Sequence, residues 1–482
     1  MKGKWFSFGC LTSVVIVILM IVFLFASLNN VSSFDKSKLT TKVADNSVLH
    51  LKISGNISEY NELKDDFFMS PFAPKTFTAH DIIEKIKMAT NDPRIDSIIL
   101  EPKWISAGYA TLHEISQALK EFQKSGKPVY AYLEMCGNKD YFLASCADKI
   151  YLNPSASAGI LLTGVGSNML FYKDLFEKVG VEMTVLHAGE YKGAGENYYR
   201  TSLSAPVKKN LTSLFSDIYD NITHELAENR GISIEDITYI YEQRDDIFIN
   251  QNKAIEYNLV DELAFKEEVI SQLISNENQL IAANKYKVKK LSAKDKDKIA
   301  VIYAQGQIAI QTSGLQQNIL SAKKLSNAID KILNDNTIKG TVIRIDSPGG
   351  SALESEIMHN KLKELKARMP VVISMANVAA SGGYYISTPS DYVFADPFTI
   401  TGSIGVVAMF PNISALNKKI GITTDKIEKG KYSNILNLYE KPDQATLTSF
   451  KKGIDKTYIE FKTRVANGRN ISLNDVEKVA KG

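Results

Sequence analysis

The chain has 482 residues, 44% of them hydrophobic and 23% charged, so it has enough apolar material for more than one buried core. A net charge of +3, without a long basic run interleaved with aromatic side chains, argues against a nucleic-acid-binding protein. The three cysteines form neither a Cys-x-x-Cys pair nor a cluster with histidine, so we expect no metal and no other cofactor. We interpret Cys136 and Cys146 as buried thiols rather than as a disulfide.

A membrane anchor is predicted at the N-terminus. Residues 10–28 read CLTSVVIVILMIVFLFASL, an almost wholly apolar run that is long enough to cross a hydrocarbon core of ~30 Å. Lys2 and Lys4 precede it, which places residues 1–9 in the cytoplasm, the anchor over 10–30 and the rest of the chain on the extracytoplasmic side. The alternative is a cleaved signal peptide, but the run is long for one and no good Ala-x-Ala site follows it.

The remainder of the sequence contains two copies of one unit. Residues 335–343 repeat the pattern of residues 92–100, and residues 383–397 repeat that of residues 140–154, each 243 positions later. An offset shared by two separate stretches indicates an internal duplication, with one structural unit in each copy.

In each copy, expected β-strands alternate with amphipathic helices, which predicts an α/β fold of β-α-β units with a parallel sheet. The first copy covers residues 46–265 and the second residues 297–482, and the polar, lysine-rich residues 266–296 are interpreted as a helix and a linker that join them. The expected strands and helices are, in chain order, 48–53, 81–89, 97–100, 113–123 and 129–133 in the first copy, and 299–303, 322–333, 341–345 and 371–375 in the second. The second copy stops at Gly482, before the counterpart of the last part of the first, and we interpret the sequence as a fragment.

A candidate nucleophile, Ser381, lies in the second copy. The apolar strand 371–375 is followed by a turn of small residues over 376–380, and Ser381 with two glycines then opens a short helix. A serine at such a corner faces a substrate closely, and the helix N-terminus favours negative charge. The simpler interpretation of this serine is a helix N-cap. Asn138 takes the same position in the first copy, which excludes serine chemistry there.

The second copy also carries a glycine pair that the first copy lacks. The strand 341–345 ends in Asp-Ser-Pro-Gly-Gly-Ser over residues 346–351, where adjacent glycines let backbone N–H groups face a crevice at the strand's carboxyl end. Such a loop suits an oxyanion hole, and it is also a common turn sequence. Residues 101–108 of the first copy contain no glycine pair.

The base for Ser381 is expected to be Lys192. No histidine lies near Ser381 in the sequence, whereas Lys192 follows the apolar strand 183–186 among small residues. Burial among such residues lowers the pKa of a lysine and leaves a neutral amine that accepts a proton. Two alternatives stay open: Lys192 is a solvated surface lysine, or His187, five residues earlier, is the base. The second copy has Ser433 at the position of Lys192.

Four motifs together resemble a known family. Residues 379–384 (AASGGY), 346–350 (DSPGG), 401–405 (TGSIG) and 190–192 (EYK) match the signatures of signal peptide peptidase A, also called protease IV, in its long duplicated form. That family forms part of serine peptidase family S49 and is related to the Clp protease and crotonase folds. The resemblance implies two tandem Clp protease/crotonase-like domains after an N-terminal transmembrane helix.

The same resemblance implies a catalytic site and a setting for it. The site residues that it implies are Ser381 as nucleophile, Lys192 as general base, Ser403 as the residue that orients the lysine, and Gly350, Gly382 and Gly349 around the oxyanion. It further implies a homotetramer at a bacterial inner membrane, with the catalytic domains on the periplasmic side. Its substrates would be cleaved signal peptides and other apolar peptides.

Two other functions are compatible with the sequence. A crotonase-like acyl-CoA enzyme would use the same oxyanion loops, although CoA is cytoplasmic and the predicted anchor places the body outside the cytoplasm. A catalytically inactive, oligomeric membrane scaffold would keep the fold without the chemistry. Labelling of Ser381 by a fluorophosphonate probe separates the peptidase from both.

Overall fold

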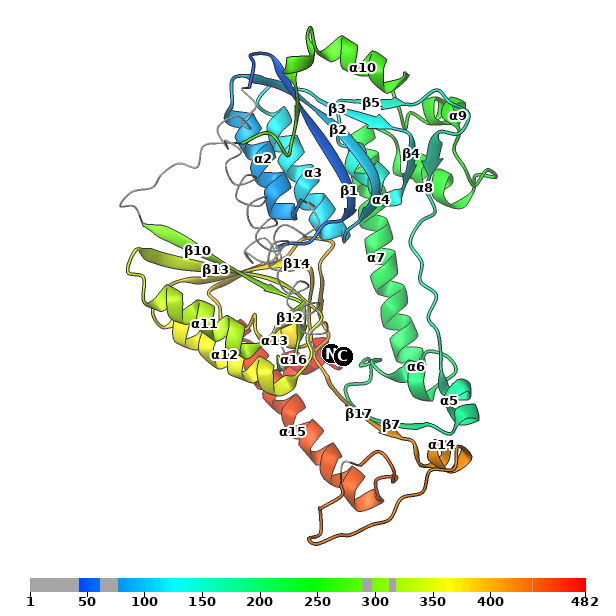
Figure 1. Cartoon of the computed structure of the whole chain (residues 1–482), viewed down its shortest axis with the longest axis vertical. Helices are drawn as coiled ribbons and strands as arrows, with labels where there is room; N and C mark the ends of the chain where they lie inside the picture. The colour runs from blue at the N-terminus through cyan, green and yellow to red at the C-terminus, as the bar shows by residue number, and fades with distance from the viewer. Residues whose placement is uncertain (1–42, 61–76, 288–296, 312–317, 436) are drawn as a thin grey trace, which may run out of the picture.

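Two α/β domains, one for each repeat, make up most of the computed structural model (Figure 1). The residues that the structure describes are 43–60, 77–287, 297–311, 318–435 and 437–482. The predicted anchor over residues 10–30 lies outside them. Within the described part of the chain, no helix is both long and apolar enough to cross a membrane.

The first repeat is organised around a six-stranded parallel sheet with the order β8-β5-β3-β2-β1-β9. Its strands are β1 (Ser47–Asn56), β2 (Ile95–Ser106), β3 (Val129–Leu133), β5 (Lys149–Leu152), β8 (Glu262–Leu263) and β9 (Leu280–Ala282). The other elements of this repeat are α2 (Ala79–Asn91), α3 (Tyr109–Gln123), β4 (Met135–Gly137), α4 (Asn138–Ala144), β6 (Gly159–Leu161), α9 (Gln251–Glu256), α10 (Lys266–Leu273) and the 3₁₀ turn Glu277–Gln279. Side chains from the sheet and from α2 and α3, such as Ile98, Leu100, Ile86 and Leu119, are fully buried in one cluster.

The second repeat has a smaller parallel sheet with the order β10-β13-β14-β15, and β16 pairs with the end of β14. Its strands are β10 (Lys298–Gln305), β13 (Ile338–Ser347), β14 (Val371–Ala380), β15 (Tyr392–Phe394) and β16 (Ile400–Gly402), and the short pair β11 (Gln307–Ile308) and β12 (Ile319–Leu320) lies beside them. Its helices are α11 (Ala322–Leu333), α12 (Ala352–Lys366) and α13 (Gly382–Tyr385). Ile329, Leu362 and Ile343 are buried where α11 and α12 pack on the sheet.

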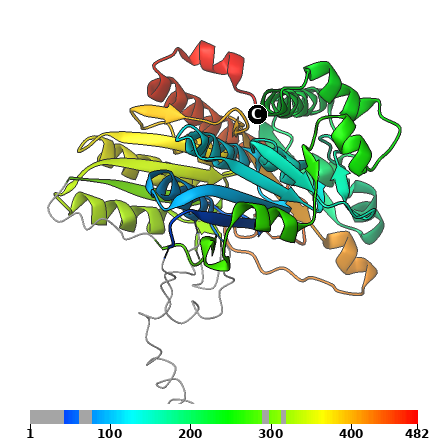
Figure 2. The same cartoon turned by 90° about the horizontal axis from the view of Figure 1, so that it is seen from above.

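The duplication extends to the long helices. α7 (Ala205–Arg230) and α15 (Gln444–Arg469) each have 26 residues and begin at a serine or aspartate cap. Each is followed by a short helix, α8 (Ile234–Glu242) and α16 (Leu473–Val479). In Figure 2 the end of the chain lies between the C-terminal helices and α7, which is seen nearly end-on.

Two local expectations differ from the structure. The turn expected over residues 376–380 is instead part of β14, because Val378–Ala380 pair in parallel with β16. The segment 266–296 contains the expected helix, α10, but it also contains β9, which pairs with β1 and completes the first sheet instead of linking the repeats. The free, buried thiols expected at Cys136 and Cys146 are confirmed.

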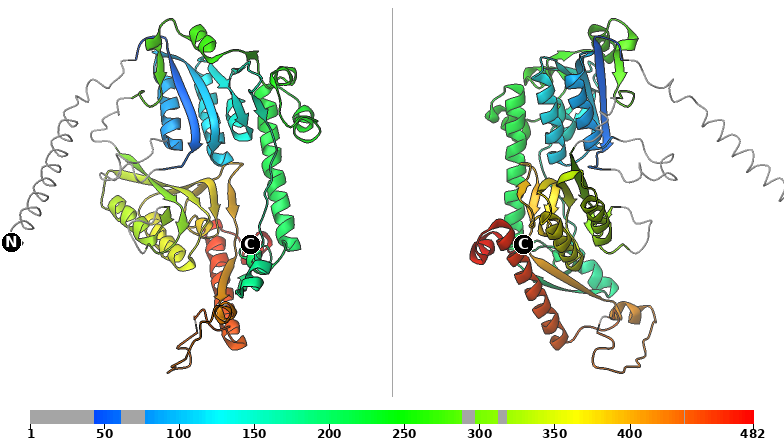
Figure 3. Two further views of the ribbon diagram at one scale, coloured as in Figure 1. Left: turned by 45° about the vertical axis from the view of Figure 1, so that its right-hand side comes forward. Right: turned by 90° about the vertical axis from the view of Figure 1, so that its left-hand side faces the viewer.

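One strand from each repeat pairs with the other in a two-stranded antiparallel sheet near Ser381. β7 (Glu182–Ala188) of the first repeat pairs antiparallel with β17 (Val406–Asn412) of the second, and Ala188 lies opposite Val406. α5 (Lys173–Val179), α6 (Glu196–Tyr199) and α14 (Ser414–Lys419) flank this pair. Figure 3 shows α7 running from the first sheet toward it.

A buried polar junction joins the repeats. Arg344 on β13 donates to Glu59 at 2.9 Å and, through both terminal nitrogens, to the two carboxylate oxygens of Glu114 on α3 at 2.7 and 2.8 Å. Nearby, His113 Nδ1 lies 2.6 Å from an Asp396 carboxylate oxygen. Each of these pairs crosses from one repeat to the other, so the junction fixes the position of β13 against the first repeat.

Candidate active site

Ser381 stands at the corner between β14 and α13. Its backbone has φ +53° and ψ −118°, a combination that a non-glycine residue adopts at a cost and that is found at the strand-to-helix corners of nucleophiles. Its N–H donates to the carbonyl oxygen of Gly402 at 2.9 Å, and its side chain makes no capping hydrogen bond. The hydroxyl is therefore not used as an N-cap, which removes the simpler interpretation.

Lys192 reaches this corner from the first repeat. Its Nζ lies 3.2 Å from Ser381 Oγ, although the two residues are 189 positions apart. The residue is only 8% exposed, and burial lowers the pKa of its amine from 10.5 to about 8. About one lysine in ten is then neutral at pH 7. Lys192 is thus not a solvated surface lysine.

Ser403 accounts for the remaining hydrogen bonds of the amine. Lys192 Nζ donates to the carbonyl oxygen and to Oγ of Ser403, each at 2.8 Å. Ser403 has a positive φ of +51°, which turns both oxygens toward the lysine. A neutral amine has two N–H groups and one lone pair, so these two bonds leave the lone pair for Ser381.

The loop that carries Ser403 packs closely against the loop that carries Lys192, at Gly405. A Cβ at Gly405 would lie 3.0 Å from Lys192 Cδ and 2.9 Å from the carbonyl oxygen of Ala188, so a larger residue there would push the strand pair apart. One end of the β7–β17 pairing is at Ala188 and Val406, next to the loop after β7 that carries Lys192 and the loop before β17 that carries Ser403. The antiparallel register therefore sets the distance between the lysine and its partners.

The glycine loop after β13 lies against the nucleophile corner. A Cβ at Gly349 would lie 2.5 Å from the nitrogen of Gly382 and 2.8 Å from Ser381 Cβ. The N–H of Gly349 already donates to Ser347 Oγ at 3.2 Å, so it is used within the loop. Gly350 follows it, and Gly382 is the first residue of α13, where an N–H has no acceptor within the helix. Of the three glycines implied by the resemblance, Gly350 and Gly382 keep donors for an oxyanion.

With this geometry in place, the chain can be compared with known proteins. The model of peptidase family S49 matches residues 121–280 and 363–482, more than half of the chain. The chain is 32% identical to serine protease SPPA, chloroplastic, of Arabidopsis thaliana over 92% of its length, and 30% identical to protease 4 of Haemophilus influenzae over 91%. The chain belongs to peptidase family S49.

The similarity to relatives extends over most of the chain. A further relative, protease 4 of Salmonella typhi, is 32% identical over 83% of the chain. The chain spans 65%, 72% and 66% of the lengths of these three relatives, in the order given. Among solved structures, a ClpP1 mutant from Listeria monocytogenes matches 37% of this chain and 77% of its own at 15% identity, with a TM-score of 0.24.

His187, the other candidate base of this S49 chain, has a different partner. It lies on β7, and its Nδ1 is 3.0 Å from the carbonyl oxygen of Gly189, two residues along the chain. Lys192, not His187, is in hydrogen-bond contact with Ser381 among the described residues.

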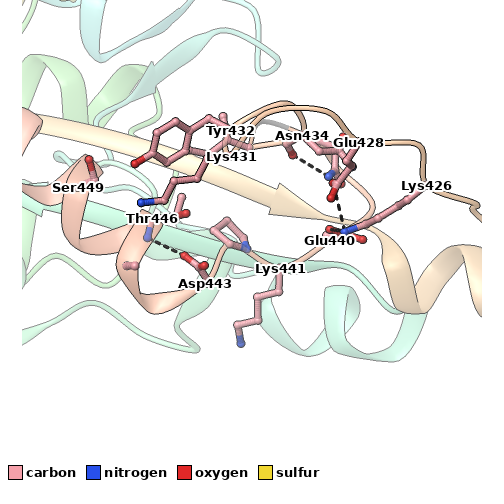
Figure 4. A pocket seen from close by; sticks show the side chains of 14 residues that line it. Lys426, Glu428, Lys431, Tyr432, Asn434, Glu440, Lys441, Asp443, Thr446 and Ser449 are labelled. Carbon is pink, nitrogen blue, oxygen red and sulfur yellow. Dashed lines mark hydrogen bonds and ion pairs between the residues drawn. The ribbon is translucent and has the colours of Figure 1, made fainter.

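A cavity of about 710 Å³ adjoins the site. Its walls come from Ser403 and Tyr191 beside the lysine, from β16, from α7 and from the end of α16. Apolar side chains such as Val207, Leu211 and Leu214 line the side formed by α7. The pocket in Figure 4 is a separate one: its lining lies between Lys426 and Ser449, near the start of α15, and includes no residue of the site.

Two contributors to the site were not singled out in the sequence. Ser347 is fully buried, donates to the carbonyl oxygen of Gly306 at 2.7 Å and accepts the N–H of Gly349, so it fixes the glycine loop. Thr401 donates to the carbonyl oxygen of Ala379 at 2.8 Å, which ties β16 to β14 just before the corner. Both lie inside the motifs quoted above, but a serine or threonine that bonds backbone has no spacing signal of its own. The apolar wall on α7 was visible as a four-residue spacing of Val207 and Leu211.

Proposed function

We propose that this chain is a serine endopeptidase with Ser381 as nucleophile and Lys192 as general base. The observation that carries the proposal is the 3.2 Å separation of Lys192 Nζ and Ser381 Oγ, groups that come from different repeats. A lysine with a lowered pKa beside a serine hydroxyl is a recognised variant of the nucleophile–base pair in acyl transfer. Membership of a peptidase family supports the same reaction.

The proposed reaction starts from the neutral amine. Lys192 takes the proton of the Ser381 hydroxyl while Oγ attacks the carbonyl carbon of a peptide bond, and Ser403 holds the lysine through both amine hydrogens. The N–H groups of Gly350 and Gly382 would hold the oxyanion of the tetrahedral intermediate.

In the second half of the reaction, Lys192 passes its proton on and the free serine hydroxyl is restored. When the C–N bond breaks, the protonated Lys192 gives its proton to the leaving amine, and an ester on Ser381 remains. Water then attacks the ester, Lys192 takes a proton from the water, and the serine hydroxyl is regenerated as the acid product leaves.

Apolar peptides, including the remnants of cleaved signal peptides, are the proposed substrates. The cavity beside Ser403 has an apolar wall on α7, which suits an apolar side chain of a peptide. A dry, apolar groove also keeps the Lys192 amine neutral, because the charged form loses solvation there. The same surroundings thus favour both the substrate and the base.

A membrane setting is proposed from the sequence. The apolar residues 10–28 after Lys2 and Lys4 would form a single-pass anchor in a bacterial inner membrane, with both repeats on the periplasmic side. Protease protection of intact spheroplasts tests this arrangement: the repeats are expected to be digested from outside while an N-terminal tag stays protected.

A homotetramer is proposed from the repeat symmetry and the resemblance. Within one chain, the Lys192 loop of the first repeat reaches the corner of the second. The matching arm of the second repeat, residues 413–435, carries exposed apolar side chains at Ile422, Ile427 and Tyr432. By the same symmetry, this arm would reach the first-repeat corner of another copy, a head-to-tail contact that closes into a ring. Sedimentation of the full chain and of Ile427→Asp tests it, with a loss of assembly expected for the variant.

Probe labelling and two alanine variants test the catalytic assignment. A fluorophosphonate is expected to label Ser381 of the full-length chain, and Ser381→Ala and Lys192→Ala are each expected to lower cleavage of an apolar peptide by at least about a thousandfold. Lys139→Ala is a matched control, because burial also lowers the pKa of that lysine but it stands at the first-repeat corner. Near-normal cleavage by either site variant contradicts the assignment, and an assembled chain that is neither labelled nor active would be a scaffold.

A further inference from the structure

A groove with apolar walls continues from the active site along α7. The cavity beside Ser403 is followed by a second one of about 700 Å³, between α7 and residues 165–171. The two cavities share Met169, Leu203 and Leu211 in their linings. The shared residues make the two cavities neighbours along α7, and the first of them reaches Ser403 of the proposed site; we treat them together as one groove.

Both walls of the second cavity contain apolar side chains among polar ones such as Lys208 and Thr212. α7 contributes Leu211 and Phe215, which lie one helical turn apart and therefore on the same face. The opposite wall includes Met169 and Phe171, and Met169 is 42% exposed. Apolar side chains that face solvent from both walls of a groove indicate a binding surface rather than a packed core.

The backbone beside this groove is unpaired. Residues 165–171 form neither helix nor strand, and Figure 1 shows the chain running beside α7 before it reaches α5. No backbone hydrogen bond joins residues 165–171 to another residue that the structure describes. Free N–H and C=O groups along an apolar groove match an extended peptide, which pairs with such a backbone as an added strand, whereas an acyl chain has no groups to pair.

We propose that this groove binds the part of a substrate peptide that lies away from the bond to be cleaved. The inference rests on the proposed peptidase function and adds a length requirement to it. From Val207 to Tyr219, α7 rises by roughly 18 Å, a distance that about five residues of extended peptide cover. Peptides that extend about five residues beyond the site should therefore bind more tightly than short ones.

Two series of reporter peptides test the proposal on the full-length chain. All share one short cleavable core and are lengthened one apolar residue at a time, at the N-terminal side in one series and at the C-terminal side in the other. In one of the two series, KM is expected to fall about tenfold by the fifth added residue, with kcat unchanged. A KM that is independent of length in both series overturns the proposal.

Variants of the groove provide the second arm. Phe215→Ser, and separately Leu211→Asn, are expected to raise KM for the long peptides about tenfold. The ratio of KM for the short core to KM for the long peptides then approaches one. Leu175→Ser is the matched control, because Leu175 is a 53% exposed leucine on α5 outside the groove, and it should keep the ratio of the parent chain. If a groove variant changes KM by the same factor for the core and for the long peptides, the proposal is overturned.

Two further outcomes are separated by the same experiment. Dissociation of an oligomer by Phe215→Ser with an unchanged KM ratio would show that a second copy of the chain covers the groove, which also overturns the proposal. Cleavage of the short core that depends on Ser381 tests the proposed function independently. If that cleavage is present and length has no effect, the groove inference alone fails; if it is absent, the peptidase proposal fails.

Discussion

The strand-to-helix corners of the two repeats have the same fold, but the side chain at the corner is hydrogen-bonded differently in each. At the second corner, Ser381 Oγ is free of any cap and faces Lys192. At the first corner, the Asn138 side chain donates to Thr163 and to the carbonyl oxygen of Gly164, and it accepts the N–H of Thr163. The Asn138 side chain is thus fully hydrogen-bonded within the first repeat.

A carboxylate completes the difference. Asp140 is buried, and its two oxygens accept the N–H groups of Ile105 and Gly137 at 2.8 and 3.0 Å. The residue 243 positions later is Gly383, which has no side chain to do this. In the first repeat, a buried carboxylate thus binds two backbone N–H groups beside the corner, whereas the second repeat has no side chain at the matching position. The comparison shows that the site lies where the fold leaves polar groups without partners.

The largest expected effect comes from making the second corner like the first. Ser381→Asn removes the attacking oxygen, so kcat/KM for an apolar peptide is expected to fall at least about 10⁴-fold with little change in thermal stability. The reciprocal change, Asn138→Ser, should give no second site, because residues 101–108 beside the first corner contain no glycine pair to form an oxyanion hole. Labelling of Asn138→Ser by a fluorophosphonate, with Ser381 replaced by alanine, would contradict this account.

The junction offers the next comparison. Arg344 pairs with two carboxylates of the first repeat, whereas Glu101, 243 positions earlier, pairs with His50 and Lys266 inside its own repeat. Arg344→Met leaves the carboxylates of Glu59, which is buried, and Glu114, which is partly buried, without their cation. We expect the free energy of unfolding to fall by about 3–5 kcal/mol and kcat to fall with it, since the repeats lose their fixed position.

Chemical denaturation and peptide cleavage measure both effects for Arg344→Met. Glu101→Gln is the control: it should lower stability while the folded chain keeps the kcat of the parent. If folded Arg344→Met keeps the kcat of the parent chain, the junction is not needed to position Lys192.

The pH dependence follows from the lowered pKa of Lys192. Only the neutral amine is a base, so kcat/KM is expected to rise about tenfold per pH unit below a pKa of about 8 and to level off above it. The folded-state pKa lies below the unfolded value of 10.5, so the folded chain gains stability as pH rises from 8 to 10.5. Lys192→Met lacks this gain, and the difference between the two chains should change by about 3 kcal/mol over that range.

Rate profiles and unfolding at pH 7 and pH 10 measure these two trends. An inflection of the rate near the pKa of imidazole that disappears in His187→Ala would identify His187 as the base and sink the lysine proposal.

The smallest expected effect concerns the residue that orients the lysine. Ser403→Ala removes one of the two acceptors of the amine and keeps the other, a backbone carbonyl, so kcat should fall about tenfold with KM unchanged. The matched change in the first repeat, Thr163→Ala, removes a partner of Asn138 and should leave kcat as it is. Equal losses in the two variants would mean that both act through stability, which thermal unfolding would show.

Comparison of the two copies was enough to point to Ser381 and Lys192 in the sequence, because Asn138 and Ser433 stand at their counterparts. The strand β3 was predicted with its bounds, since its apolar run is short and clearly delimited. The β7–β17 pairing was not predicted: both strands are edge strands from different repeats, and local periodicity does not encode which distant edges meet. The role of Asp140 was also hidden, because an acidic residue near a helix start reads as an ordinary cap.

The β7–β17 pairing has a consequence for the synthesis of the protein. A ribosome that has completed the first repeat has made Lys192 but not Ser381, and the two meet only after strand 406–412 has emerged and paired across the repeats. On the proposed assignment, a nascent or half-folded chain cannot hydrolyse its neighbours. The duplication would then delay proteolysis until the two repeats have folded against each other.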